Sequence, residues 1–224
     1  MTTSAVLDAA RAQAQLARGL WADRRFRAPM LTIWVATFGS SLHGPVTTFF
    51  YLRVGASARD VGALNAIITG VAVAVAPLWG VWQDRARSAR PMRAAAALCA
   101  AGCAVRGAAS SVGELYAAAA VLGLGGVNLW TAVLAHVCHG TPRARRSLVT
   151  SGYAAQQGAL RLLGTALFPA FDGGLRLCGL ARELPRFRVE MGVCTLFCFA
   201  GVFFMFAAAR GAGAGAAARA AAGA

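Results

Sequence analysis

The 224-residue sequence has few charged residues, and most of these are positive. Only 13% of residues are charged, eight acidic and 22 basic, which gives a net charge of +14. Lysine is absent, and we interpret the exclusive use of arginine as a bias toward GC-rich codons, not as a functional signal. Nucleic-acid-binding proteins distribute basic residues over soluble elements. Here the arginines lie between long apolar segments, so we expect no nucleic-acid partner.

The sequence also lacks the residue patterns of the enzymes that a membrane chain could contain. An intramembrane serine protease needs a glycine two residues before its serine, whereas Val149 precedes Ser151 by two. A di-histidine metal site needs an i, i+4 spacing and a third ligand, whereas His136 and His139 are three apart. No nucleophile has a neighbouring base. We therefore predict that the protein is not an enzyme.

The six cysteines do not indicate a disulfide framework. Cys99 and Cys103 are four residues apart, as are Cys194 and Cys198, and both pairs lie in apolar segments. This spacing places each pair on one helix face. A metal site would need further ligands, and none is nearby in the sequence. We interpret these cysteines as small packing residues and expect no metal ion or cofactor.

Hydrophobic residues are abundant, at 58% of the chain, and the mean hydropathy is +0.59. Six segments reach or approach the roughly 20 residues that a helix needs to cross a bilayer. They are residues 29–52, 61–82, 91–110, 112–138, 148–171 and 189–209. We predict an all-α, polytopic membrane protein with six transmembrane helices and a lipid bilayer as its partner. Arg106 interrupts the third segment near its far end, so five spans or a re-entrant third segment remain alternatives.

The arginines are distributed unequally between the two sets of connections. Fourteen lie before the first segment, in the second-to-third and fourth-to-fifth connections, or after the sixth segment; six lie on the opposite side. By the positive-inside rule, both termini are expected on the cytoplasmic side. The connection around residues 172–188 departs from the rule, because it has four arginines that Glu183 and Glu190 offset only in part.

The two ends of the chain differ from the predicted transmembrane domain, residues 29–209. Residues 1–28 form a basic, amphipathic segment, which we interpret as a tail because its last arginines adjoin the first apolar segment. An organelle transit peptide is the alternative, so the membrane in question stays open. Residues 210–224 are almost entirely glycine and alanine. We predict a disordered tail or a linker there.

The second apolar segment has a recognisable start. Ser57 followed by Asp60 is the Ser-x-x-acid arrangement of a capping box. A helix is therefore expected to begin just before Val61. Trp79 and Trp82, near its end, are interpreted as anchors at the membrane interface.

Polar side chains inside the apolar segments are the candidates for a substrate pathway. Each costs free energy in hydrocarbon unless it faces water or the bundle interior, and Arg161 costs most, roughly 2.5–3.5 kcal/mol at a central position. The candidates are His43, Asn65, Asn128, Gln157 and Arg161. Alternatively, Arg161 pairs with a helix carbonyl or reaches the interface, and His43 bonds to a neighbouring serine or carbonyl. The glycines of the fourth and fifth segments (Gly123, Gly125, Gly126, Gly158 and Gly164) are expected to allow close helix packing.

The connection between the second and third segments contains a distinctive cluster, in which Gly80, Asp84, Arg85 and Arg90 stand in sequence. It resembles the signature of the major facilitator superfamily, whose loop between helices 2 and 3 reads roughly Gly-x-x-x-Asp-Arg-x-x-x-Arg. The resemblance extends over about residues 31–209. It implies that Asp84 is a gating residue that holds the cytoplasmic ends of two halves together. It also implies that Gly80 permits their close contact.

The chain departs from this family in two respects. The residues before Gly123 lack the arginine that the family carries in its fourth helix. The family has twelve spans in two halves, whereas six are expected here, so the chain resembles an amino-terminal half. The resemblance implies secondary transport of a small molecule or ion by alternating access, as a homodimer or with a separate second half. The alternative is a non-transporting membrane scaffold, assembly factor or truncated transporter fragment.

Overall fold

The computed structural model describes residues 11, 14, 15 and 18 and the ranges 24–86, 90–139, 141–180 and 183–222. Within these ranges the chain is all-α, with six long helices, a single short 3-10 helix and no strand. The helices are α2 (Arg24–Val54), α3 (Ala58–Ala86), α4 (Arg90–Ala108), α5 (Val112–His139), α6 (Arg146–Leu177) and α7 (Glu183–Ala222), with η1 at Arg143–Arg145. The all-α prediction is confirmed.

Five helices cover an apolar segment and extend beyond it, whereas α4 ends at Ala108, two residues before the end of the third segment. The start of α3 follows the expected capping box. The Ser57 backbone N–H donates to the Asp60 carboxylate over 2.8 Å, and the Asp60 N–H donates to the Ser57 hydroxyl over 3.2 Å. α7 continues to Ala222, because alanine has the highest helix propensity of all residues. It therefore covers most of the segment for which a tail or linker was expected.

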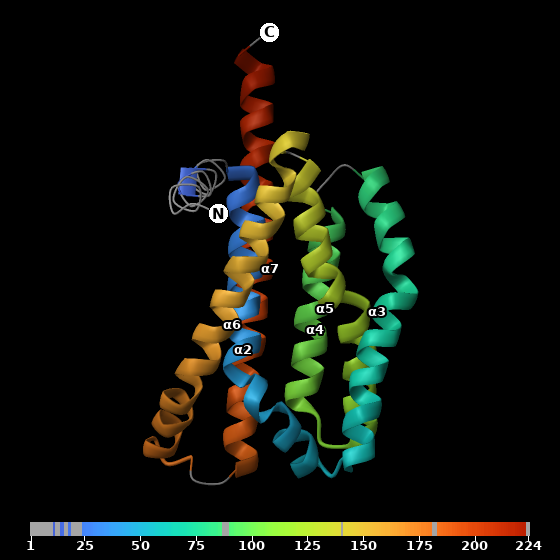
Figure 1. Cartoon of the computed structure of the whole chain (residues 1–224), viewed down its shortest axis with the longest axis vertical. Coiled ribbons are helices and arrows are strands. Elements are labelled where there is room, and N and C mark those ends of the chain that lie inside the picture. Colours follow the sequence, from blue (N-terminus) through green and yellow to red (C-terminus); the bar gives the residue numbers. More distant parts are fainter. Residues whose placement is uncertain are drawn as a thin grey trace, which may run out of the picture.

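The helices run alternately up and down, so their connections gather at two ends of the bundle (Figure 1). The start of α2, the α3–α4 and α5–α6 connections and the end of α7 lie at one end, which we call the arginine end. The α2–α3, α4–α5 and α6–α7 connections lie at the other, which we call the opposite end. α2 packs against α6 and α7, α4 against α5 and α7, and α3 against α5.

Glycines of α5 allow its neighbours to pack closely on two sides. A Cβ at Gly125 would overlap the Leu98 side chain on α4, and one at Gly123 would lie 2.8 Å from the Ile68 carbonyl on α3. Gly164 of α6 likewise approaches Ser41 on α2, where a Cβ would lie 2.7 Å from the Ser41 Cβ. The predicted packing role is confirmed at these three positions. It is wrong at Gly158, which has no neighbouring atom within 4 Å of an added Cβ.

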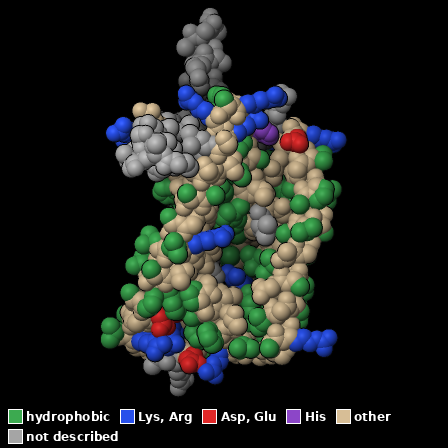
Figure 2. Space-filling view, viewed as in Figure 1, with side chains coloured by type: hydrophobic (Ala, Val, Ile, Leu, Met, Phe, Trp, Pro, Cys, Tyr) green, Lys and Arg blue, Asp and Glu red, His purple; other side chains and the backbone are tan. Residues whose placement is uncertain are grey.

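Most charged side chains of the face shown in Figure 2 gather at its two ends. Apolar side chains are common between the ends, where some arginine side chains are also visible. Among the described residues, two helical stretches, Ala58–Arg85 and Val112–His139, are long and apolar enough to cross a membrane. The core helix of a soluble protein could meet the same criteria, but it would be buried. Only 11% of the most apolar window of Ala58–Arg85 is buried, which favours lipid around α3.

Candidate functional site

The cluster that resembles a gating motif lies at the arginine end and faces outward. Gly80 and Asp84 lie in the last turns of α3, Arg85 follows, and Arg90 begins α4. Asp84, Arg85 and Arg90 are exposed. No hydrogen bond or ion pair joins Asp84 to a residue that the structure describes, and a Cβ at Gly80 would meet no atom within 4 Å. The close contact that the resemblance assigns to Gly80 is therefore not made within the described part of this chain.

The two tryptophans beside this cluster have different environments. Trp79 is buried, and its indole N–H donates to the Leu124 carbonyl of α5 over 2.9 Å. Trp82 is 42% exposed and lies against Trp79, with ring centroids 5.2 Å apart. An interface anchor is expected to expose its ring, so this interpretation suits Trp82. Trp79 instead joins α3 to α5.

A polar node connects three helices in the interior of the bundle. The side-chain oxygen of Gln157 on α6 accepts hydrogen bonds from the Thr37 hydroxyl on α2 and from the Trp130 indole on α5, the latter over 3.2 Å. The three residues lie 9 to 13 residues from the arginine-end limits of their helices, which is roughly 14–20 Å along the helix axes. They are therefore near the middle of the apolar zone.

The amide nitrogen of Gln157 is the free part of this node. It is buried and has no hydrogen-bond partner among the described residues. Around it, the Trp34 indole donates to Gln156 over 3.3 Å and the Tyr153 hydroxyl donates to the Trp130 carbonyl over 3.3 Å. A buried N–H group without a partner costs free energy. The node therefore offers an unoccupied donor to a polar group that enters the bundle.

The other predicted pathway residues do not join this node as a single site. Arg161 lies one turn after Gln157 on α6 and is exposed, and Asn65 is exposed on α3. Asn128 is buried, but its amide donates to the Leu124 carbonyl of its own helix over 3.1 Å. The side chain of His43 is outside the described residues. Gln157 and Arg161 are thus the two predicted residues that the structure places together.

A second polar cluster, at the opposite end, was not predicted as a site. Asp172 of α6 forms ion pairs with Arg176 over 2.9 Å and with Arg186 of α7 over 2.7 Å. Arg53, in the last turn of α2, and Glu183, the first residue of α7, form another ion pair at this end. Asp172 thus pairs with Arg176 and Arg186, two of the four arginines that departed from the positive-inside rule. The signal in the sequence was the i, i+4 spacing of Asp172 and Arg176.

Glu190 is the most buried member of this cluster, at 1% exposure. Its carboxyl faces Asp172 and Arg186, and no nitrogen donor of the described residues forms a hydrogen bond with either of its oxygens. Arg186 itself is 5% exposed. Burying such groups is costly unless they are paired. The cluster therefore ties the ends of α6 and α7 together through charge.

Comparison of the chain with protein-family models and with curated proteins found no significant match.

Proposed function

We propose that the chain is one half of a membrane transporter that moves a small molecule or ion by alternating access, paired with a second copy of itself or with a separate six-helix half. The outward-facing Gly80 and Asp84 carry this proposal. A carboxylate that holds two halves together needs a partner outside its own half, and a glycine that permits close contact needs open space beside it. Both conditions fit this end of α3.

In this proposal all six helices cross the bilayer. The shortest, α4, has 19 residues, or about 28 Å at 1.5 Å per residue, which is close to the thickness of a hydrocarbon core. The start of α2, the α3–α4 and α5–α6 connections and the end of α7, where the sequence has the larger share of its arginines, lie at one end of the bundle. By the positive-inside rule this end would face the cytoplasm. Large apolar side chains on three different helices, such as Leu78, Leu162 and Leu196, are about 70% exposed, as lipid contact requires.

The polar node supplies the proposed substrate contact. Transporters of this kind bind substrate near the bilayer midplane, at the interface between their repeats. Gln157 offers a free amide donor at about this depth, and Arg161 lies one turn away with a positive charge. A cavity at the interface between two halves needs both of them, so the second half would close the site. An anionic or hydrogen-bond-accepting solute suits these two side chains.

Asp84 would act as the gate in this arrangement. Its carboxylate is stabilised by the positive end of a helix and by arginines of the facing half. Contacts of this kind break when the cytoplasmic side opens and form again when it closes. The rate of the transition would then depend on the charge of residue 84.

Cross-linking in native membranes tests the proposal without knowledge of the substrate. Val81 lies beside the gating cluster and is 50% exposed, so Val81→Cys is the test variant. Leu196 on α7 is 68% exposed, and Leu196→Cys is the control. Cys138, Cys178 and Cys194 are replaced by serine in both. We expect a short bis-maleimide to cross-link the Val81→Cys chain to a second copy or to another six-helix chain, and the control to remain monomeric. A monomer in both cases would overturn the proposal and favour the non-transporting alternative.

A further inference from the structure

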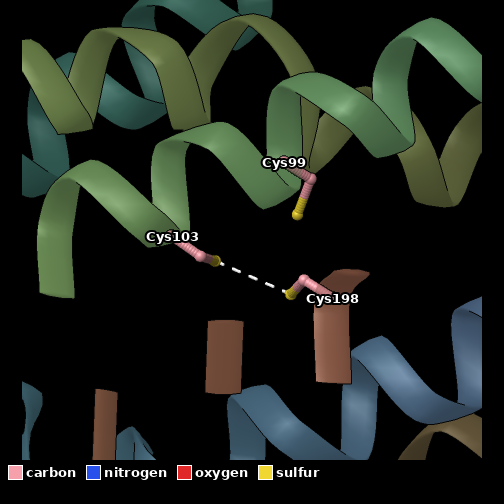
Figure 3. A group of neighbouring side chains, drawn as sticks. All are labelled: Cys99, Cys103 and Cys198. Carbon is pink, nitrogen blue, oxygen red and sulfur yellow. Dashed lines mark hydrogen bonds between the residues drawn. The ribbon is translucent and has the colours of Figure 1, made fainter. Parts of the chain in front are cut away.

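Three cysteines from two helices meet in the interior of the bundle. Cys99 and Cys103 lie one turn apart on α4, and Cys198 of α7 faces them (Figure 3). The three sulfur atoms all lie within 4.8 Å of one another, and the Cys103 and Cys198 sulfurs are 3.7 Å apart. All three residues are buried, at 4–5% exposure. The pair on α4 therefore gains a third sulfur from a residue far along the chain.

These distances suit a shared cation. Three sulfurs bound in a plane to one ion, at a metal–sulfur distance of about 2.3 Å, would lie about 4 Å apart. The observed separations differ from this arrangement by less than about 1 Å. Small side-chain rotations of Cys99 and Cys198 would bring the three sulfurs around an ion, and no movement of the helices is needed.

We propose that Cys99, Cys103 and Cys198 form a binding site for Cu(I). Thiolate ligands select soft ions, of which Cu(I) and Zn²⁺ are the usual mononuclear examples. Structural zinc sites are almost always four-coordinate, whereas the described residues place three ligands here. Alanines of α4 (Ala95, Ala96 and Ala100) belong to the same buried core as the three cysteines, which leaves little access for a water as fourth ligand. Three-coordinate Cu(I) fits such a site.

Arg106 offsets part of the negative charge that Cu(I) binding would create at the three sulfurs. Three thiols lose three protons to solvent when they bind one Cu(I), so the complex carries a net charge of −2. A guanidinium nitrogen of Arg106 lies 3.9 Å from the Cys103 sulfur and donates toward it. A neighbouring arginine stabilises the thiolate form of cysteine. The arginine that interrupts the third apolar segment thus offsets half of the charge of the complex.

Metal loading of the intact chain tests the proposal. The full-length protein in detergent micelles, kept reduced and free of oxygen, is incubated with the acetonitrile complex of Cu(I) in the presence of bicinchoninate as a competing chelator. We expect one copper per chain after desalting, and X-ray absorption that shows sulfur ligands alone. Loss of all copper to the chelator, or a first shell of nitrogen or oxygen, would overturn the proposal. This measurement uses the unmodified chain, so it does not depend on whether a variant folds.

Matched alanine variants then assign the site. Cys198→Ala should weaken Cu(I) binding by at least about ten-fold, since even the loss of a residue that only supports a metal ligand costs this much. Cys178→Ala removes an exposed cysteine and should leave the affinity unchanged. Equal affinities of these two variants would overturn the assignment to this cluster. Zn²⁺ added in place of copper should be removed by desalting, and its retention at one per chain would overturn the choice of Cu(I).

Discussion

Trp130 of α5 donates its indole N–H to the side-chain oxygen of Gln157 on α6, 3.2 Å away, and the Thr37 hydroxyl of α2 donates to the same oxygen. One amide oxygen therefore joins α6 to α5, the preceding long helix, and to α2, which is distant in the sequence. Because this oxygen accepts both bonds, neither donor is left unpaired in an apolar interior. The remaining N–H₂ group has no such partner. The side-chain oxygen of Gln157 thus stabilises the bundle, whereas its side-chain nitrogen is open to a ligand.

Gln157→Ala should lower the stability of the bundle. It removes the acceptor of two buried donors, and each unpaired buried donor costs about 1–3 kcal/mol. Gln156→Ala is the control, because Gln156 is only partly buried and accepts the single Trp34 bond. The midpoint of unfolding in mixed detergent micelles measures both. Equal shifts for the two variants would contradict the role of the node.

Gly125→Ala should destabilise the packing of α4 on α5. An added Cβ would overlap Leu98 and lie 2.8 Å from the Ala95 carbonyl, and overpacking of this kind costs about 1–3 kcal/mol. Gly158→Ala makes the same substitution where no atom lies within 4 Å. It should be neutral or stabilise the helix by up to about 1 kcal/mol. The midpoint of thermal unfolding should therefore fall for Gly125→Ala and should rise or stay the same for Gly158→Ala.

Arg186→Met should destabilise the opposite end of the bundle. It leaves the buried Glu190 carboxyl and the partly buried Asp172 carboxyl without their buried cation, and removal of one member of a buried ion pair costs about 3–5 kcal/mol. Arg176→Met is the control. Its side chain is 60% exposed, so its pair with Asp172 contributes less than about 1 kcal/mol. A comparable loss of stability in both variants, measured by chemical unfolding, would show that burial does not decide the effect.

The helices could be predicted from the sequence because apolar length, capping and small residues are local signals. The capping box at Ser57 and Asp60 marked the start of α3 to within three residues, and Gly123 and Gly125 marked the contact faces of α5. The six-helix arrangement followed from the same local pattern. Bilayer crossing by all six helices stays a prediction, because two helical stretches meet the criterion of length and hydropathy.

The sites depended on contacts between distant residues, which no local pattern specifies. Cys99 and Cys103 were interpreted as packing residues, because the third cysteine of the cluster, Cys198, lies on another helix. Gln157 was named as a candidate, but Thr37 was not, since a threonine in an apolar helix normally bonds to its own backbone. The pairing of Asp172 with Arg186 depends on how α6 and α7 meet across their connection. Each of these contacts depends on which faces of the two helices pack against each other.

Arg161→Cys should report the alternation that we propose. Arg161 is exposed in the middle of α6, one turn from the polar node. If the two halves rock about the node, a membrane-impermeant maleimide should label residue 161 from either side of sealed vesicles, because the site faces each side in turn. Leu163→Cys, also exposed but without a polar neighbour, should be labelled from neither side. Labelling of residue 161 from one side only would contradict alternation.

Asp84→Asn should leave the isolated chain as stable as before and impair the paired one. Asp84 is exposed and has no bonded partner within the described part of the chain, so its charge contributes little to the fold, and unfolding midpoints should agree within about 0.5 kcal/mol. In the pair, the loss of charge removes the attraction to a helix end and arginines. Cross-linking of Val81→Cys should then decrease at least several-fold. Glu at position 84 keeps the charge and should restore part of the yield. Unchanged cross-linking in Asp84→Asn would show that the carboxylate does not hold two halves together.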